Sequence, residues 1–240
     1  MRVLAIDTSS DALGVALLSE QGITERSVET ARGHAEQILP LIDAVLGEAN
    51  VRLAQLDGIA AGVGPGTFTG VRISVAVAQG LAYGAGLPVV PITSLEALAY
   101  PVIEAGADRV IACLDARMGE VYFGCFARDL ALGLRTLGSL QVAPPARVYL
   151  PSAELYHGIG RGFTAHPELA ALAGISLDAR SAAALPSAVD MARLGALRLA
   201  AGQGLDPAAL KPEYVRDKVA LTEAERRAAQ SRPANGGPAK

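Results

Sequence analysis

The chain has few cysteines, no excess of basic residues and no long apolar segment, and each absence excludes a class of protein. Its two cysteines, Cys113 and Cys125, form neither a metal-ligand spacing nor a disulfide framework, and they fit a reducing compartment. A formal net charge of −3 excludes a basic nucleic-acid-binding arm, so we expect any RNA substrate to be held by another protein.

No stretch approaches the roughly 20 apolar residues that a membrane-spanning helix needs. The first apolar run ends at Asp7, before the apolar region of a signal peptide could form. We therefore expect a cytoplasmic protein.

Hydrophobic residues, by contrast, are abundant. They make up 51% of the 240 residues, while charged residues make up 19%, a balance typical of a chain that folds around a large core. The length fits one large domain or two small ones. Intrinsic disorder over the whole chain is excluded.

Two parts of the chain follow the same plan. Residues 2–6 are an apolar strand that ends at Asp7, and a polar turn and a second strand follow. Residues 109–114 repeat this pattern and end at Asp115. The repetition predicts a duplicated α/β unit.

We assign two lobes and a tail to this duplication. The N-terminal lobe covers residues 1–100 and the smaller C-terminal lobe covers 101–220, with a last predicted helix over 182–201 that is a candidate to pack back on the first lobe. Residues 221–240 are polar and become rich in Pro and Gly, which predicts a mobile tail.

A glycine-rich loop over residues 62–70 joins a predicted strand at 56–62 to a predicted helix at 68–84. It lacks the Gly-Lys-Ser/Thr ending of a P-loop, and Thr69 stands where a dinucleotide-binding loop has its last glycine. Two interpretations remain open. The loop is either a tight strand-to-helix turn capped by Thr67 or a docking loop defined by its backbone.

Two polar turns are candidates for a nucleotide site. The turn Asp7-Thr8-Ser9-Ser10 could wrap a phosphate with its amides and hydroxyls, or it is a solvated hairpin tip. Asp115 is the matching acid of the second half. The glycine-rich stretch 158–162 could approach a nucleobase, although a flexible turn is the favoured interpretation.

Metal-dependent and nucleophilic catalysis have no candidate of comparable strength. A metal-binding helix beginning at His34 would need a second ligand one turn later, and that position holds Ile38 with Gln37 beside it. The chain also lacks a Gly-x-Ser-x-Gly motif.

The two predicted helices near residues 35–48 and 68–84 carry apolar residues on two sides. On the second helix, one stripe contains Val71, Val75, Ala78 and Ala82, and the opposite stripe contains Ile73, Val77, Gly80 and Leu81. A surface helix needs a single apolar stripe, so the pattern indicates either a thick core or a partner on the outer side. We favour the partner.

Several ordered motifs of the chain resemble those of the TsaB (YeaZ) family. They are Asp7-Thr8-Ser9, His34-Ala35-Glu36, Gly64-Pro65-Gly66-Thr67-Phe68-Thr69-Gly70-Val71-Arg72, Thr93-Ser94-Leu95, Asp115-Ala116-Arg117-Met118-Gly119-Glu120-Val121-Tyr122 and Pro212-Glu213-Tyr214-Val215-Arg216. The resemblance is loose over residues 128–205 and absent after residue 222. It implies an actin-like α/β fold of the sugar-kinase and Hsp70 type, with two related lobes.

The resemblance also implies a function. Members of this family are non-catalytic paralogues of TsaD, which transfers threonylcarbamoyl to the tRNA adenosine beside the anticodon and carries a His-x-x-x-His metal pair that is broken here at Ile38. The expected partners are TsaD, the ATPase TsaE and a second copy of the chain, with tRNA contacted only through the complex. We expect no catalytic residue, no metal and no tightly bound cofactor, and ATP or ADP is a candidate ligand at the partner junction.

The residues that we assign to the partner interface come from the two helices and the loop between them. They are Leu39, Leu46, Gly66, Thr67, Phe68, Val71, Arg72, Val75, Ala78 and Ala82. Two rival hypotheses remain: an autonomous ATP-dependent enzyme, such as a kinase or carbamoyl transferase that uses Asp7 and Asp115, and a metallopeptidase.

Overall fold

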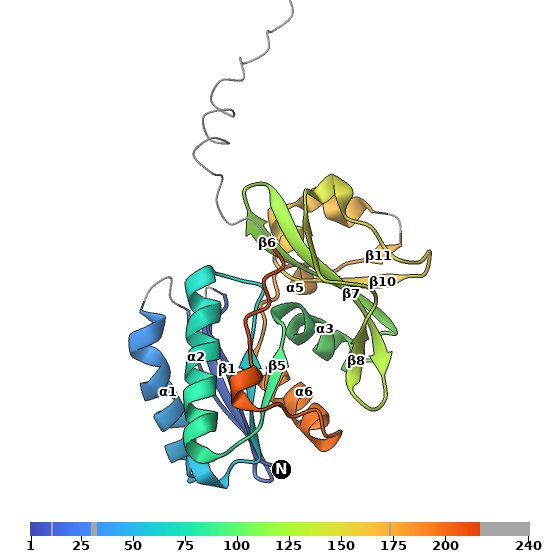
Figure 1. Ribbon diagram of the computed structural model, residues 1–240. Coiled ribbons are helices and arrows are strands. Elements are labelled where there is room, and N and C mark those ends of the chain that lie inside the picture. Colours follow the sequence, from blue (N-terminus) through green and yellow to red (C-terminus); the bar gives the residue numbers. More distant parts are fainter. Residues whose placement is uncertain (11, 30–32, 173, 217–240) are drawn as a thin grey trace, which may run out of the picture.

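A computed structural model describes residues 1–10, 12–29, 33–172 and 174–216. They form two α/β lobes, each built on one sheet (Figure 1). The first sheet has the strand order β3-β2-β1-β4-β5. Its strands are β1 (Val3–Asp7), β2 (Ala12–Ser19), β3 (Gly22–Glu29), β4 (Gly58–Gly62) and β5 (Val89–Ile92). The strand β2 runs antiparallel to both β1 and β3, whereas β4 and β5 lie parallel to β1.

The second sheet repeats this arrangement with the order β8-β7-β6-β10-β11. Its strands are β6 (Arg109–Arg117), β7 (Glu120–Asp129), β8 (Gly133–Thr136), β10 (Tyr156–Ile159) and β11 (Ile175–Ser176), and β9 (Gln141–Ala143) also pairs with β7. Here β6 and β7 are antiparallel, and β10 lies parallel to β6. The predicted duplication is confirmed, because Asp7 and Asp115 lie near the ends of equivalent central strands.

Among the described residues, three long helices pack on the first sheet and a fourth packs on the second. They are α1 (His34–Glu48), α2 (Phe68–Ala85), α3 (Ser94–Glu104) and α6 (Ala188–Ala200). Figure 1 shows α1 and α2 on one side of the first sheet and α6 on the other. Because successive strand side chains alternate between faces, Leu4 and Ile6 pack with α1 and α2, while Val3 and Ala5 pack with α6.

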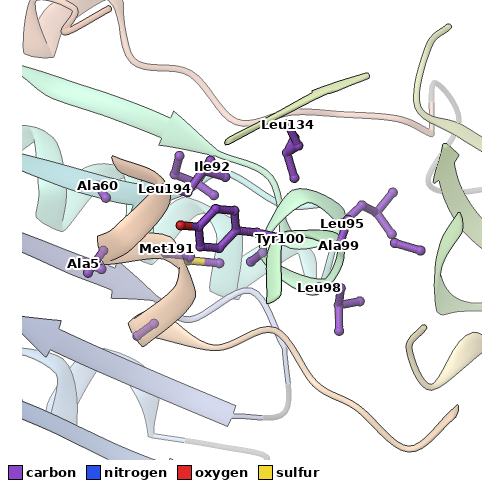
Figure 2. Packing of buried hydrophobic residues seen from close by; sticks show 14 of the residues in the cluster. Ala5, Ala60, Ile92, Leu95, Leu98, Ala99, Tyr100, Leu134, Met191 and Leu194 are labelled. Carbon is purple, nitrogen blue, oxygen red and sulfur yellow. The ribbon is translucent and has the colours of Figure 1, made fainter. Parts of the chain in front are cut away.

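The lobes share a core between α3 and α6. Tyr100 of α3 points toward α6 and lies beside Met191 and Leu194 (Figure 2). On its other side α3 packs against β6, β7 and β8 of the second sheet. The helix α6 therefore comes from the second half of the chain but packs on β1, β2 and β4 of the first lobe.

The predicted helix over residues 182–201 begins too early in the sequence. The structure has a short α5 (Ala179–Ala182), then an irregular segment, and α6 begins only at Ala188 with Ser187 as its N-cap. Pro186 explains the interruption, because the residue before a proline is driven away from helical backbone angles.

The outer face of the second sheet is covered by short elements. They are α4 (Gly162–Ala165), α5, η2 (Pro145–Arg147) and η3 (Pro167–Ala171), while η1 (Leu53–Gln55) and η4 (Pro207–Ala209) lie on the first lobe. Cys113 and Cys125 are buried in the core of the second lobe as free thiols, and burial raises the pKa of Cys125 to about 12. Neither thiol is poised for reaction.

Within the described ranges, no helix has the length and apolar character needed to cross a membrane. The predicted tail at residues 221–240 lies outside the residues that the structure describes.

Candidate functional site

The polar turn after β1 is buried and internally hydrogen-bonded. The backbone N–H of Ser9 donates to Asp7 Oδ1 at 3.0 Å, and the hydroxyl of Thr8 donates to the carbonyl oxygen of Gly70 at 2.5 Å. The hydroxyls of Ser9 and Ser94 share a hydrogen bond of 2.8 Å. The solvated hairpin tip is therefore wrong for Asp7, Thr8 and Ser9, since all three are buried.

Asp7 lies at the centre of this turn. Burial raises the pKa of Asp7 above its usual value, and the hydrogen bonds from Ser9 and the nearby charge of His34 oppose that shift. One carboxylate oxygen of Asp7 and the hydroxyls of Thr8 and Ser9 are thus already hydrogen-bonded inside the protein. Of the four residues assigned to a nucleotide, Ser9 and Ser10 line an open cavity.

The glycine loop packs directly on this turn. A Cβ atom at Gly66 would collide with the carbonyl oxygen of Ser9, and one at Gly70 would collide with that of Thr8. The N–H of Thr67 donates to the Ser9 carbonyl at 2.7 Å, and the Thr67 hydroxyl accepts from the Gly70 N–H at 3.2 Å. The tight turn capped by Thr67 is confirmed, and the glycines serve close packing of one backbone on another.

A cavity of about 500 Å³ lies between the two lobes, within the size range of small-molecule sites. Its walls come from the glycine loop, the β6–β7 turn, the α4 region and the end of the described chain. The lining residues are Ser9, Ser10, Pro65, Gly66, Thr67, Phe68, Val71, Leu114, Asp115, Ala116, Arg117, Tyr122, Arg161, Thr164, Ala165, Ala183, Leu185, Glu213, Tyr214, Val215 and Arg216.

The second-lobe wall contains the other predicted polar residues. Asp115 Oδ1 accepts a hydrogen bond of 2.8 Å from the N–H of Arg117, which has a left-handed φ of 61°. Gly160 packs against the carbonyl of Cys113, so close that a Cβ would collide with it. The glycine stretch 158–162 therefore serves close packing, and Arg161 from it reaches the cavity.

The last described residues bridge the two lobes, and we call residues 211–216 the strap. On the first lobe, the N–H of Glu213 donates to the Val63 carbonyl at 2.8 Å. On the second lobe, Arg216 forms an ion pair of 2.6 Å with Glu120 and donates to the carbonyl of Ala116 at 3.1 Å. The strap thus forms one wall of the cavity and ties both lobes together.

The structure corrects the predicted partner face of α1 and α2. Five of the residues assigned to it are buried inside the chain: Leu46, Val71, Val75, Ala78 and Ala82. Four of them pack in the core between the helices and the first sheet, and none is accessible to a partner. In the opposite stripe, Ile73, Val77 and Leu81 are partly buried against the same core while Gly80 is exposed, so the thick-core interpretation holds for most of this pattern.

The remaining assigned residues are exposed: Leu39, Gly66, Thr67, Phe68 and Arg72. Ala76, Gly80 and Tyr83 of α2 are also exposed. They follow Arg72 at intervals of three or four residues, which places them on the same side of the helix. We call Arg72, Ala76, Gly80 and Tyr83 the outer face of α2. It forms one continuous accessible side of this helix, and Phe68, Thr69 and Gly84 are exposed as well.

The described residues contain no group of three or more His, Cys, Asp or Glu side chains that could hold a metal ion. His34 begins α1, and Ile38, one turn later, is buried in the core.

Comparisons with known proteins agree with these features. Residues 22–155 match the family model described as TsaD, tRNA N6-adenosine threonylcarbamoyltransferase. The chain is 36% identical to the tRNA threonylcarbamoyladenosine biosynthesis protein TsaB of Haemophilus influenzae, covering 91% of this chain and 95% of that protein. It is 35% identical to TsaB of Escherichia coli, covering 92% and 96% respectively.

Among solved structures, YeaZ from Pseudomonas aeruginosa superimposes with a TM-score of 0.80 at 40% identity, covering 89% of this chain and 99% of that one. The two duplicated lobes are those of the actin-like fold of the TsaD type. The chain belongs to the TsaB (YeaZ) family.

Proposed function

We propose that this protein is the non-catalytic subunit of the machinery that makes threonylcarbamoyladenosine in tRNA, that it pairs with TsaD and supports TsaE, and that it works in the cytoplasm. The observation that carries the proposal is its similarity, over nearly the full length of both chains, to TsaB proteins named for this biosynthesis.

A non-catalytic role fits the site. The carboxylate of Asp7 is buried and accepts a hydrogen bond from the N–H of Ser9 in the same turn. The glycine loop packs against the backbone of that turn. A catalytic group must instead reach the substrate. These residues hold the loop and the start of α2 in one conformation, which suits a subunit that presents a rigid surface.

We assign TsaD to the exposed side of α1 and α2, which includes Leu39 and the outer face of α2. Ala76 and Gly80 have small side chains, so the helix of a partner could approach α2 closely. A paralogue that shares the fold can supply a complementary helical face, and a second copy of this chain can use the same surface.

Contact with tRNA is assigned to the complex and not to this subunit. Phosphate contacts depend on Lys and Arg, and the chain carries 21 of these against 24 Asp and Glu. No tightly bound cofactor is proposed for the chain itself, and ATP or ADP is assigned to the junction with the partner.

One observation favours a second candidate, an autonomous ATP-dependent enzyme. The cavity between the lobes is large enough for a small ligand and carries Asp115 on its wall. Titration calorimetry with Mg-ATP separates the candidates: tight binding with turnover by the isolated chain, lost in Asp115→Ala, would favour the enzyme.

Reconstitution tests the leading proposal. Purified tRNA and threonylcarbamoyl adenylate are incubated with this chain, TsaD and TsaE, and with mixtures that each omit one protein, and the modified nucleoside is measured. We expect modification to need both this chain and TsaD, and the chain alone to be inactive. Modification by the chain alone, or undiminished modification without it, would overturn the proposal.

A further inference from the structure

Three side chains from two distant segments form an exposed cluster at the start of α2. The guanidinium carbon of Arg72 lies 3.7 Å from the centroid of the Phe68 ring, and Arg72 Nε donates a hydrogen bond of 2.9 Å to the hydroxyl of Tyr214 in the strap. The two rings are stacked, with centroids 6.1 Å apart and an interplanar angle of 29°. We call these three residues the arginine cluster.

The cluster is exposed despite its aromatic content. Phe68 is 44% and Tyr214 is 47% accessible to solvent. The contacts to Arg72 use its Nε and the flat side of its guanidinium. Among the described residues, no carboxylate pairs with Arg72 and no acceptor is bonded to its two terminal nitrogens, so within this part of the chain those N–H donors are available.

Such an arrangement is preorganised to bind an anion. A guanidinium offers two parallel N–H donors that match the two oxygens of a carboxylate. Stacking on Phe68 and the bond to Tyr214 already restrict the side chain, so less conformational entropy is lost when a ligand binds. Arg and Tyr are also among the residues that dominate the energetics of protein interfaces.

Resting on the function proposed above, we propose that the arginine cluster is the electrostatic anchor for the partner protein, and that Arg72 receives an Asp or Glu carboxylate of TsaD in a bidentate pair. The argument for a protein is position: Arg72, Ala76 and Gly80 follow one another at four-residue spacing on the same side of α2. A helix lying along this stripe would reach Arg72 at its end.

The anchor also reaches the cavity. Tyr214 lies two residues before Arg216, which holds the β6–β7 turn through Glu120. A partner that fixes Arg72 therefore fixes the strap, which is one wall of the cavity between the lobes. Binding at α2 should therefore slow amide hydrogen exchange in the strap.

The test compares four variants in titrations against purified TsaD at low and high salt. Arg72→Gln removes the charge, Arg72→Lys keeps the charge without the planar fork, and Tyr214→Phe removes only the hydroxyl that orients Arg72. Arg135→Gln is the matched control, because Arg135 is an exposed arginine on β8 of the other lobe. Thermal melts verify that each variant is folded.

We expect Arg72→Gln to weaken binding at least about tenfold and to flatten its salt dependence. The affinities of Arg72→Lys and Tyr214→Phe for TsaD should lie between those of Arg72→Gln and the wild type. The affinity of Arg135→Gln should stay within about twofold of the wild type, because the charge of Arg135 is remote. Slower exchange in the strap should accompany binding of the wild type and be lost in Tyr214→Phe.

The outcomes separate the two proposals. If the wild type itself does not bind TsaD, the proposed function fails. If the wild type binds and Arg72→Gln binds equally well, the anchor is refuted while the function stands. The anchor is also refuted if Arg72→Gln impairs only binding of labelled tRNA, or only self-association of the chain.

Discussion

Glu96 of α3 and Arg198 of α6 form a largely buried ion pair, with Arg198 Nη2 2.6 Å from Glu96 Oε1. Each partner has further bonds: Glu96 accepts from the N–H and hydroxyl of Thr93 at 2.8 Å, and Arg198 donates to the carbonyl of Pro91 at 3.2 Å. The same glutamate thus completes the capping box of α3 and holds α6, 102 residues away, against the first lobe.

Removing one member of this pair should cost substantial stability. We expect Arg198→Met to lower the free energy of unfolding by about 3 kcal/mol, because it leaves the Glu96 carboxylate buried without its cation. Urea denaturation measures the change. Arg193→Met on the same helix is the control: Arg193 is 43% exposed and lies 3.5 Å from Glu104 and 3.8 Å from Asp190, so we expect less than about 1 kcal/mol. Equal losses in the two variants would contradict this account.

Two glycines of α2 should respond in opposite directions to the same substitution. A Cβ at Gly70 would collide with the Thr8 carbonyl, so Gly70→Ala should destabilise the fold by about 3 kcal/mol or more. Gly80 has nothing within 4 Å of the new atom, so Gly80→Ala should stabilise the helix by about 0.5–1 kcal/mol. Thermal denaturation of the two variants measures both changes in stability. A destabilised Gly80→Ala would contradict the open space around Gly80.

Two alanines, two positions apart on α2, test which side of the helix faces the core. Ala78 is fully buried, so Ala78→Arg should yield no stable folded protein. Ala76 is exposed, and Ala76→Arg should keep the free energy of unfolding within about 0.5 kcal/mol of the wild type. Circular dichroism during heating measures both, and a folded Ala78→Arg would refute the orientation of α2.

Asp190 should make stability depend on pH. Burial raises its pKa from 3.8 to about 6, with Arg193 opposing the shift and Glu104 and Glu25 adding to it. The folded state therefore binds more protons than the unfolded state between about pH 4 and pH 6, and this contribution to stability is lost as pH rises through that window.

Asp190→Asn removes this titration. Because the side chain keeps some contact with solvent, we expect the variant to be more stable than the wild type by about 1–2 kcal/mol at about pH 7.5 and equally stable near about pH 4. Denaturant titrations at both values measure the difference. If the variant were less stable than the wild type at the higher pH, the ion pair of Asp190 with Arg193 would outweigh the cost of desolvating the Asp190 carboxylate.

The sequence contains enough information to predict the duplicated lobes and most of their elements. Apolar strands that end at Asp7 and Asp115 are easy to recognise because both are buried central strands. The strand β3 carries no such signal. It is an edge strand with charged residues such as Glu25 and Arg26, which natural sheets use at their edges, and its sequence has no clear alternation.

The orientation of α2 was harder to predict, for a physical reason. The side that faces the sheet includes Gly70 and Ser74, and the Ser74 hydroxyl donates to the carbonyl of Ile6 at 3.0 Å. Because the buried side of α2 contains polar and small residues, apolar periodicity does not identify it. Apolar residues on both flanks of the helix instead give two plausible apolar stripes. Contacts with Tyr214, 142 residues from Arg72, could not be inferred from spacing at all.

The measurement that tests the central claim most directly is sedimentation velocity of this chain mixed with purified TsaD, for the wild type and for Ala76→Arg. We predict that the wild type forms one faster-sedimenting species containing both proteins, and that Ala76→Arg, while folded, leaves the two proteins sedimenting separately. Separate sedimentation of the wild type, or an unchanged complex with Ala76→Arg, would contradict a subunit that pairs with TsaD through the outer face of α2.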